Sequence, residues 1–168
     1  VSITIAAVND APSFDNQGDV TVAEDAGGQT YFGWASNPVV GPADESIQTY
    51  SYVVSSNNHP EYFSSGPTVG TNGALSFTTA PNKNGVATVG VKIQDSGSGT
   101  PPNANQSAAS TFTITITAVN DNPTPSNDLR NVQENAPATL MHVLDNDNTN
   151  NSDGAETLTV VSVDTTGT

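Results

Sequence analysis

The sequence contains an internal repeat, which limits the folds open to it. Residues 1–12 read VSITIAAVNDAP and residues 112–123 read FTITITAVNDNP, at an offset of 111 residues. A second pair of segments, VAEDAG at 22–27 and VQENAP at 132–137, recurs at an offset of 110 residues. Self-similarity at a fixed period is typical of tandem arrays. The chain is therefore predicted to contain one small unit together with parts of its neighbours.

The repeat defines the expected domain boundaries. Residues 1–12 would be the last strand and linker of a preceding repeat, and residues 13–118 a complete unit. Residues 119–125 would form the next linker, and residues 126–168 would begin a further, incomplete repeat. The simplest interpretation is a segment of a longer tandem array.

Short alternating apolar segments, separated by turn residues, predict β-strands throughout the complete unit. Valine (18 residues) far outnumbers leucine (5 residues), which favours strand over helix. Strands are expected at 19–23, 29–34, 47–55, 67–70, 74–79, 86–95 and 109–118. Asn72-Gly73 is a strong hairpin signal between the fourth and fifth of these. The predicted fold class is all-β, an antiparallel seven-stranded β-sandwich.

Alternation within the strands separates a buried face from a solvent face. In the sixth expected strand Val91 and Ile93 face one way and Lys92 faces the other. The seventh strand alternates apolar residues with threonines in the same manner. The expected core consists of Val22, Trp34, Tyr52, Leu75, Phe77, Val91, Ile93, Phe112 and Ile114.

Composition excludes several classes of function. The chain carries 17 acidic residues against 3 basic ones, so it cannot neutralise a run of phosphates, and nucleic acid is not an expected partner. The shortage of cations also argues against anionic membrane surfaces, and no apolar run is long enough for membrane insertion. With no cysteine, disulfides, thiolate metal sites and thiol catalysis are excluded.

The acidic residues lie in the expected connections rather than along the strands. Alternate connections of a sandwich meet at the same end, so these carboxylates should gather at the two ends of the unit. Oxygen ligands that cluster without His or Cys suit Ca²⁺. A solvated acidic surface that keeps the protein soluble is the alternative interpretation.

The end of the complete unit resembles the end of a cadherin repeat. QDSGSGTPP at 94–102 and TFTITITAVNDNP at 111–123 are similar to the Asp that closes the sixth cadherin strand, the Gly/Pro loop, the last strand and the Asp-x-Asn-Asp-Asn linker. Ala118 departs from that pattern, because cadherins carry the first Asp of the linker there. The bacterial cadherin-like repeats of large surface adhesins, joined by Val-Asn-Asp-x-Pro, are a closer resemblance. Residues 121–163 resemble the related tandem repeats of the same proteins.

This resemblance implies a calcium site at each junction between units. The C-terminal junction would draw on the base of the first strand, a middle loop, the linker and the next unit: Glu24, Asp44, Glu45, Asn120, Asp121, Asn122, Asp145 and Asp147. The N-terminal junction would use Asn9, Asp10 and Asp95, together with upstream residues that this chain lacks. The middle loop departs from the family pattern, because ADES at 43–46 replaces the usual Asp-Arg-Glu.

Charge and geometry give such junctions a mechanical role. Without metal, carboxylate loops that face each other across a linker repel, so neighbouring units swing freely. A bound Ca²⁺ cancels two charges and ties both units to the linker, which stiffens the array. Extracellular calcium modules bind at about 10⁻⁴ to 10⁻³ M, so these sites would fill outside a cell. The resemblance implies that the chain is a calcium-stiffened structural or extender repeat of a bacterial cell-surface or secreted adhesin. Its expected partners are the neighbouring repeats of the same chain.

Adhesion itself is the alternative function. On the cadherin analogy, units on opposing cells would make homophilic contacts. Alternatively, aromatic side chains would line a platform for surface glycans. The candidates for that platform are Tyr31, Trp34, Tyr50, Tyr52, Tyr62 and Phe63, of which Trp34, Tyr52 and Phe63 are equally expected as core residues.

Enzymatic activity is not expected. The only imidazoles, His59 and His142, fall in different units and have no catalytic motif around them. A Lys–Asn isopeptide cross-link would need Lys83 or Lys92, and Lys92 is expected to face solvent. Threonines alternate along residues 113–117 as in ice-binding rows, but three on one strand are more simply its solvent face.

Overall fold

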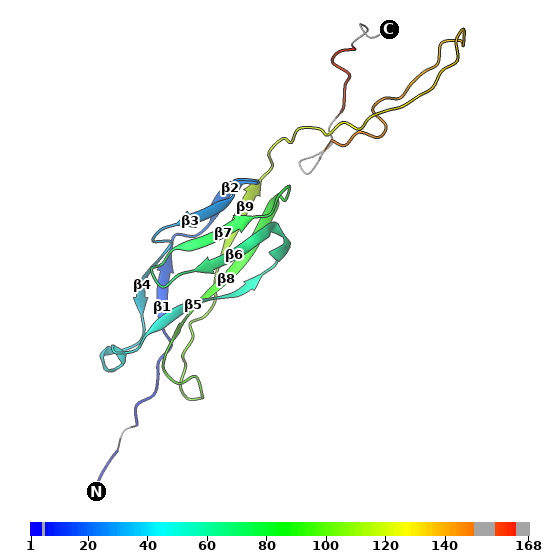
Figure 1. The fold of residues 1–168 in the computed structure, drawn as a ribbon. Helices are drawn as coiled ribbons and strands as arrows, with labels where there is room; N and C mark the ends of the chain where they lie inside the picture. The colour runs from blue at the N-terminus through cyan, green and yellow to red at the C-terminus, as the bar shows by residue number, and fades with distance from the viewer. Residues whose placement is uncertain (5, 150–156, 164–168) are drawn as a thin grey trace.

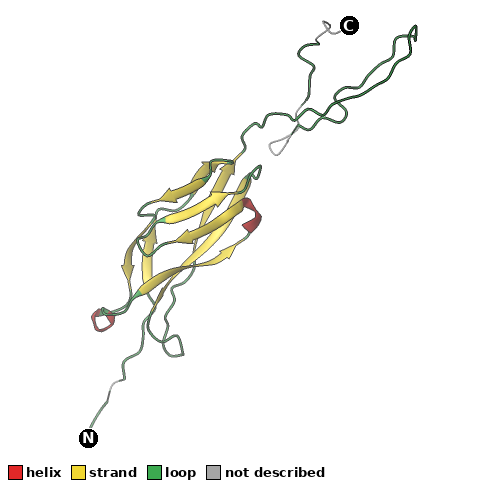
Figure 2. Ribbon diagram, in the orientation of Figure 1, coloured by secondary structure: helices red, strands yellow, loops and turns green. Residues whose placement is uncertain are grey.

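The computed structural model describes residues 1–4, 6–149 and 157–163 of the chain. Within these residues the helical elements are two short 3₁₀ turns, η1 (Ala43–Glu45) and η2 (Pro60–Tyr62), and all other regular structure is β-strand (Figure 2). None of the described residues form a helix that is long and apolar enough to cross a membrane. The predicted all-β class is confirmed.

The described part of the chain forms nine strands in three sheets. The strands are β1 (Ser13–Asn16), β2 (Val20–Ala23), β3 (Gly28–Tyr31), β4 (Ala35–Val39), β5 (Tyr50–Asn57), β6 (Phe63–Val69), β7 (Leu75–Thr79), β8 (Gly85–Asp95) and β9 (Ser110–Thr117). One sheet has the order β2-β9-β8-β5, a second has the order β3-β7-β6, and β1 pairs with β4 alone. The hairpin predicted at Asn72-Gly73 is confirmed and joins β6 to β7.

The predicted strand list is wrong at β1 and β4, which it does not contain. β1 ends in a turn where the Gly18 N–H donates to Asn16 Oδ1 at 2.8 Å, and Gly18 has a φ of +80°. β3 ends before Gly33, whose φ is +67°. Gly33 lies inside the strand predicted at 29–34, and its left-handed backbone, which glycine adopts without strain, ends β3 earlier than the alternation indicates.

The prediction of a purely antiparallel arrangement is also wrong for one pair. β2 runs parallel to β9, with Val20 opposite Ile114 and Val22 opposite Ile116. The chain enters β1 beside β4 and then crosses to the other sheet at the turn after Asn16. It therefore reaches β2 while still running in the direction of β9.

Side chains from all three sheets meet in one hydrophobic core. Eight of the nine predicted core residues are buried, and the ninth, Tyr52, is partly buried and packs against them. Trp34 is fully buried, donates its indole N–H to the Gly18 carbonyl at 2.9 Å and contacts the Phe112 ring at a centroid distance of 4.4 Å. The alternation read from the sequence thus locates the core.

The folded body is elongated, with the N-terminal segment leaving at one end and the C-terminal segment at the other (Figure 1). We call these ends the N-terminal pole and the C-terminal pole. The N-terminal pole consists of residues 9–12, 40–49 and 95–109. The C-terminal pole consists of residues 24–27, 80–84 and 118–122. Hydrogen bonds join the segments within each pole.

Beyond β9, the described residues 118–149 and 157–163 contain no strand. An isolated bridge pairs Thr124 with Asn148 through N–H···O bonds of 2.8 and 3.0 Å. The predicted further repeat at 126–168 includes residues 150–156 and 164–168, which lie outside the described residues, and residue 5 of the predicted preceding strand does too. The domain boundaries and the tandem organisation stay predictions.

Candidate metal centre

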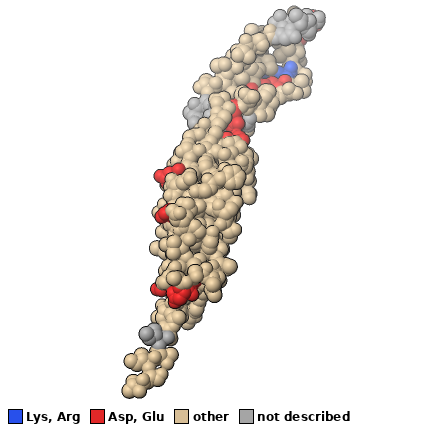
Figure 3. Space-filling model, turned by 90° about the vertical axis from the view of Figure 1, so that its left-hand side faces the viewer, with Lys and Arg blue, Asp and Glu red and all other residues tan. Residues whose placement is uncertain are grey.

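Acidic side chains gather toward the two ends of the folded body. Figure 3 shows one acidic group near the N-terminal end and another where the C-terminal segment leaves the body, with smaller acidic spots between them. The three Lys and Arg residues, Lys83, Lys92 and Arg130, lie one at a time along the chain. Negative charge therefore accumulates toward the two ends, and Lys83 is a single counter-charge within the C-terminal pole.

Asn9 is the centre of a hydrogen-bond network at the N-terminal pole. Its Nδ2 donates to Asp95 Oδ1 at 3.2 Å and to the Ala104 carbonyl at 2.7 Å. Its Oδ1 accepts a hydrogen bond from Gln48 Nε2 at 2.6 Å. Its main-chain N–H donates to Asn103 Oδ1 at 2.8 Å. The linker residue is thus held by the end of β8 and by both long loops of this pole.

Glu45, in η1, completes this network from the loop between β4 and β5. Its Oε1 accepts a hydrogen bond from the Asp10 N–H at 3.0 Å. Glu45 is 7% exposed, Asp95 is 4% exposed and Asn9 is 8% exposed. Neither buried carboxylate forms an ion pair with a described residue. Burial of unpaired carboxylates is costly, so this pole places negative charge where the fold does not compensate it.

Three oxygen atoms of the N-terminal pole are buried without a hydrogen-bond partner among the described residues. They are Glu45 Oε2, Gln48 Oε1 and Asp95 Oδ2. The partner oxygen of each carboxylate is engaged: Glu45 Oε1 by Asp10, and Asp95 Oδ1 by Asn9 and by the Gly97 N–H at 2.8 Å. Buried polar atoms are normally satisfied, so these three oxygens are positions where a hydrogen-bond donor or a cation can bind.

Two glycines make room for this network. A Cβ on Gly41, whose φ is +154°, would overlap the Glu45 carboxylate. A Cβ on Gly97 would overlap the side-chain amide of Asn9. A side chain at either position would therefore force Glu45 or Asn9 to move from its place in the network.

At the C-terminal pole, Glu24 follows β2 and is 1% exposed. Its Oε1 accepts a hydrogen bond from the Val119 N–H at 2.8 Å, and its Oε2 accepts one from Asn84 Nδ2 at 3.4 Å. In the adjoining linker, Asn120 Nδ2 donates to the Asp121 carbonyl at 3.4 Å. Glu24 thus holds the linker after β9 in the way that Glu45 holds the linker before β1.

The expected membership of the C-terminal junction requires a correction. Asp44 and Glu45 belong to the N-terminal pole, because β4 runs toward that end and β5 starts from it. Glu24, Asn120, Asp121 and Asn122 do lie in the C-terminal pole or its linker. The order of the predicted strands already indicates this placement, because every second connection between antiparallel strands returns to the same end of the unit.

The remaining residues predicted for that junction lie beyond the linker. Asp147 Oδ1 accepts a hydrogen bond from the Ser126 N–H at 2.7 Å. The Asp145 N–H donates to the His142 carbonyl at 3.4 Å. Gln48 and Asn103, in contrast, belong to the N-terminal network although the sequence analysis did not select them, because amides in loops carry no distinctive pattern.

The N-terminal pole fits an ion that binds only oxygen. In the part of the chain that the structure describes, no three His, Cys, Asp or Glu side chains come together as a metal-binding group. The polar side chains that this pole does bring together include the buried carboxylates of Glu45 and Asp95 and the amides of Asn9 and Gln48. Ca²⁺ accepts carboxylate, amide and carbonyl oxygens in a flexible geometry, whereas Zn²⁺ favours nitrogen and sulfur.

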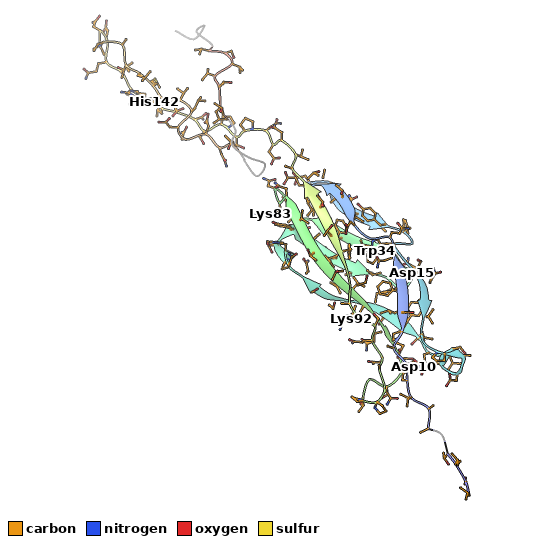
Figure 4. All side chains as sticks on the ribbon, turned by 180° about the vertical axis from the view of Figure 1, so that it is seen from behind. Asp10, Asp15, Trp34, Lys83, Lys92 and His142 are labelled. Atoms are coloured by element: carbon orange, nitrogen blue, oxygen red, sulfur yellow. The ribbon has the colours of Figure 1, made fainter. Side chains whose placement is uncertain are left out.

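Most of the aromatic side chains considered for a glycan platform lie in the core or pack against it. Trp34 and Phe63 are buried, and Tyr31, Tyr52 and Tyr62 pack against the core. Figure 4 shows His142 in the C-terminal segment, Lys83 toward the C-terminal end of the body and Lys92 nearer the N-terminal end.

His59 lies in the connection between β5 and η2. Its ring stacks on Tyr62 at a centroid distance of 4.6 Å, and its Nδ1 lies 2.8 Å from Glu61 Oε1. The hydrogen bond with His59 lowers the pKa of the Glu61 carboxyl below its ordinary value.

Comparison of the chain with protein-family models, with curated proteins and with solved structures gives no match. The chemistry of the two poles, and of the linkers that they hold, is therefore the basis on which a function can be assigned.

Proposed function

We propose that this chain is a structural spacer, a calcium-stiffened extender repeat of a bacterial cell-surface or secreted adhesin. Its partners would be the neighbouring repeats of the same chain, and its place of action would be outside the cell. The matching linker sequences, Val8-Asn9-Asp10 and Val119-Asn120-Asp121, support the tandem arrangement. The first linker precedes β1 at the N-terminal pole, and the second follows β9 at the C-terminal pole.

The finer fold that we propose is a seven-stranded β-sandwich of the cadherin or immunoglobulin type. β1 and β2 are then two halves of a first strand that changes sheet near Gly18, and β3 and β4 are two halves of a second strand interrupted at Gly33. The core shared between sheet β2-β9-β8-β5 and sheet β3-β7-β6 supports this interpretation. Linkers at opposite ends of an elongated body suit a spacer (Figure 1).

One observation carries the proposal: two buried carboxylates without ion-pair partners contact the linker itself. Glu45 binds the Asp10 N–H, and Asp95 binds the Asn9 side chain. The linker and the body are thus joined at two buried carboxylates that have no ion-pair partner among the described residues. A cation bound there would restrict the orientation of the linker relative to the folded body, and such a restriction stiffens the junction.

The residues of the chain orient the linker before any ion binds. Glu45 and Glu24 each accept a main-chain N–H of a linker, and Asn103 and Ala104 hold Asn9 from the opposite loop. A bound Ca²⁺ would supply the positive charge that the buried carboxylates lack. With a formal net charge of −14, the chain otherwise favours separation of its segments.

Thermal unfolding and small-angle X-ray scattering of the chain test this proposal. The samples are compared in EDTA, across a Ca²⁺ titration and with Mg²⁺ as the control. We expect the melting temperature to rise as Ca²⁺ approaches the millimolar range, and the scattering to report a narrower distribution of overall dimensions. Part of the rise should be lost in Asp121→Ala, which removes a linker carboxylate at the C-terminal pole. If neither the melting temperature nor the distribution of overall dimensions changes with Ca²⁺, the proposal is overturned.

A further inference from the structure

β5 lies at the edge of the sheet β2-β9-β8-β5, where it pairs with β8 alone. A main-chain contact just before the strand fixes the direction of its hydrogen bonds: the Ser96 N–H donates to the Thr49 carbonyl at 2.9 Å. Because main-chain groups alternate in direction along a strand, Ser51 and Val53 face β8 as Thr49 does.

The intervening residues Tyr50, Tyr52 and Val54 therefore direct their main-chain N–H and C=O groups away from β8. No main-chain hydrogen bond of the described residues reaches these groups from the open side. Figure 1 shows β5 along one side of the folded body. The N–H donors and C=O acceptors of these three residues are thus available to a further extended strand.

The other edge strands of the described residues carry features that discourage such pairing. β1, β2 and β3 have only four residues each. β4 contains Pro38, and β6 contains Pro67 and two register shifts. β5 has eight residues without proline, glycine or charge, and its register shift lies after Val54. Natural proteins protect sheet edges by short length, proline, bulges or charge, so β5 is the edge left open to another strand.

A second copy of the chain is the occupant that this edge fits. A strand that pairs here must bring an unpaired edge of its own, and among the described strands β5 itself is the long one with such an edge. Antiparallel pairing of two β5 strands places Tyr52 of each copy opposite the other and Tyr50 opposite Val54, which uses all the outward groups. Charge favours the same place, because β5 is uncharged whereas the acidic side chains of this chain of net charge −14 gather toward the poles (Figure 3).

We propose that two copies of the chain associate through antiparallel pairing of residues 50–54 at their β5 edges. The sheet β2-β9-β8-β5 then continues from one copy into the other. This contact goes beyond the spacer function, because it requires neither a linker nor a metal ion. A ladder this short buries less area than the ~1,200 Å² at which stable interfaces begin, so the association is weak and depends on concentration.

Sedimentation equilibrium of the full chain in EDTA measures this association without any contribution from Ca²⁺. The double variant Ser51→Glu, Val53→Glu places carboxylates of the two copies directly opposite each other across the paired edges. Its dimerisation should be weaker than that of the wild type by about tenfold. Both positions are exposed, and at position 53 the new carboxylate lies opposite Lys92 on β8, which helps to retain the fold.

Val86→Glu, Thr88→Glu is the matched control for this double variant. It adds the same charge at two exposed, alternate positions of β8, a strand that has neighbours on both sides. Its dimerisation should differ from that of the wild type by less than about threefold, because exposed charges away from the contact are screened by salt. Equal weakening in the two double variants, or a wild type that stays monomeric up to ~1 mM, would overturn the proposal.

Amide hydrogen exchange, followed by NMR in dilute and in concentrated samples, locates the contact. The N–H groups of Tyr50, Tyr52 and Val54 should exchange at least about twofold more slowly in the concentrated sample, because pairing engages them. Those of Ser51 and Val53 already face β8 and should exchange at the same rate in both samples. Protection that rises with concentration at another strand, or at none, would overturn the proposed pairing.

Discussion

Asn9 and Asp95 are 86 residues apart in sequence, and the Asn9 side-chain amide donates a hydrogen bond of 3.2 Å to the buried Asp95 carboxylate. Asn9 belongs to the linker and Asp95 ends β8, the longest strand. The linker is therefore attached to the central part of the fold rather than to a peripheral loop. Its direction depends on the same strand that contributes Val89, Val91 and Ile93 to the buried interior.

Replacement of Asn9 by Ala should destabilise the fold. The substitution leaves Asp95, Gln48 and the Ala104 carbonyl without the partner that the Asn9 amide supplies. Loss of buried hydrogen-bond partners costs about 1–3 kcal/mol of unfolding free energy. Urea unfolding followed by circular dichroism measures this loss.

Asn120→Ala is the matched control for Asn9→Ala, because Asn120 is the equivalent linker residue after β9 and is exposed. We expect its effect to stay within about 0.5 kcal/mol. Equal losses of unfolding free energy in the two variants would contradict the inference that the buried hydrogen bonds of Asn9 stabilise the fold.

The Val119 amide should be protected from hydrogen exchange by Glu24. Glu24→Leu removes the acceptor that lies 2.8 Å from that N–H, so exchange at Val119 should accelerate by about tenfold or more. Amide exchange followed by NMR measures the rate residue by residue.

Asp25→Ala provides the cross-control for Glu24→Leu. Asp25 Oδ1 accepts the Asn82 N–H at 3.2 Å, so its removal should expose Asn82 and spare Val119. If Val119 exchanges equally fast in the wild type and in Glu24→Leu, Glu24 does not hold the linker in solution.

Gly73→Ala should be strongly destabilising at the hairpin between β6 and β7. Gly73 has a φ of +78°, and a Cβ there would overlap the Ala35 carbonyl. A left-handed alanine alone costs about 1–2 kcal/mol, and the overlap adds to it. The unfolding free energy in urea is the relevant measurement.

Gly28→Ala tests whether the effect at Gly73 is local. At Gly28 a Cβ meets only Thr78 Oγ1 at an ordinary 3.6 Å. That change should be neutral or stabilising by less than about 1 kcal/mol, because it restricts the unfolded chain. A similar loss from both substitutions would contradict the structural explanation.

The contact between His59 and Glu61 should give the region around η2 a pH dependence. His59 lowers the pKa of Glu61 through their hydrogen bond. A carboxyl whose pKa is lower in the folded state contributes stability that is present above its unfolded pKa and is lost as pH falls through its folded pKa. NMR titration of the Glu61 carboxyl should show a pKa that rises toward the ordinary value in His59→Ala. An unchanged pKa in that variant would show that the hydrogen bond is not formed in solution.

Sequence patterns located most of the core because a strand exposes alternate residues, and this period of two is local. Phe112, Ile114 and Ile116 are buried while Thr113 and Thr115 are only partly so, as the alternation indicates. The Asn72-Gly73 hairpin follows from local chemistry as well. The all-β class and the concentration of acidic residues in connections could thus be predicted without tertiary information.

The membership of each pole does not follow from local spacing, because it requires a count of how many times the chain reverses along the predicted strands. Glu45 joins Asp10 rather than Glu24, since the loop between β4 and β5 returns to the end where the first linker enters. The breaks at Gly18 and Gly33 depend on backbone angles that alternation does not encode.

The strand-rich class, the buried face of the main strands and the supply of oxygen ligands can all be derived from residue type and short-range spacing. Tertiary contacts are what bring Asn9, Glu45, Gln48 and Asp95 into one network. A loop side chain is buried by the loops packed around it, and here these loops come from three separate parts of the chain.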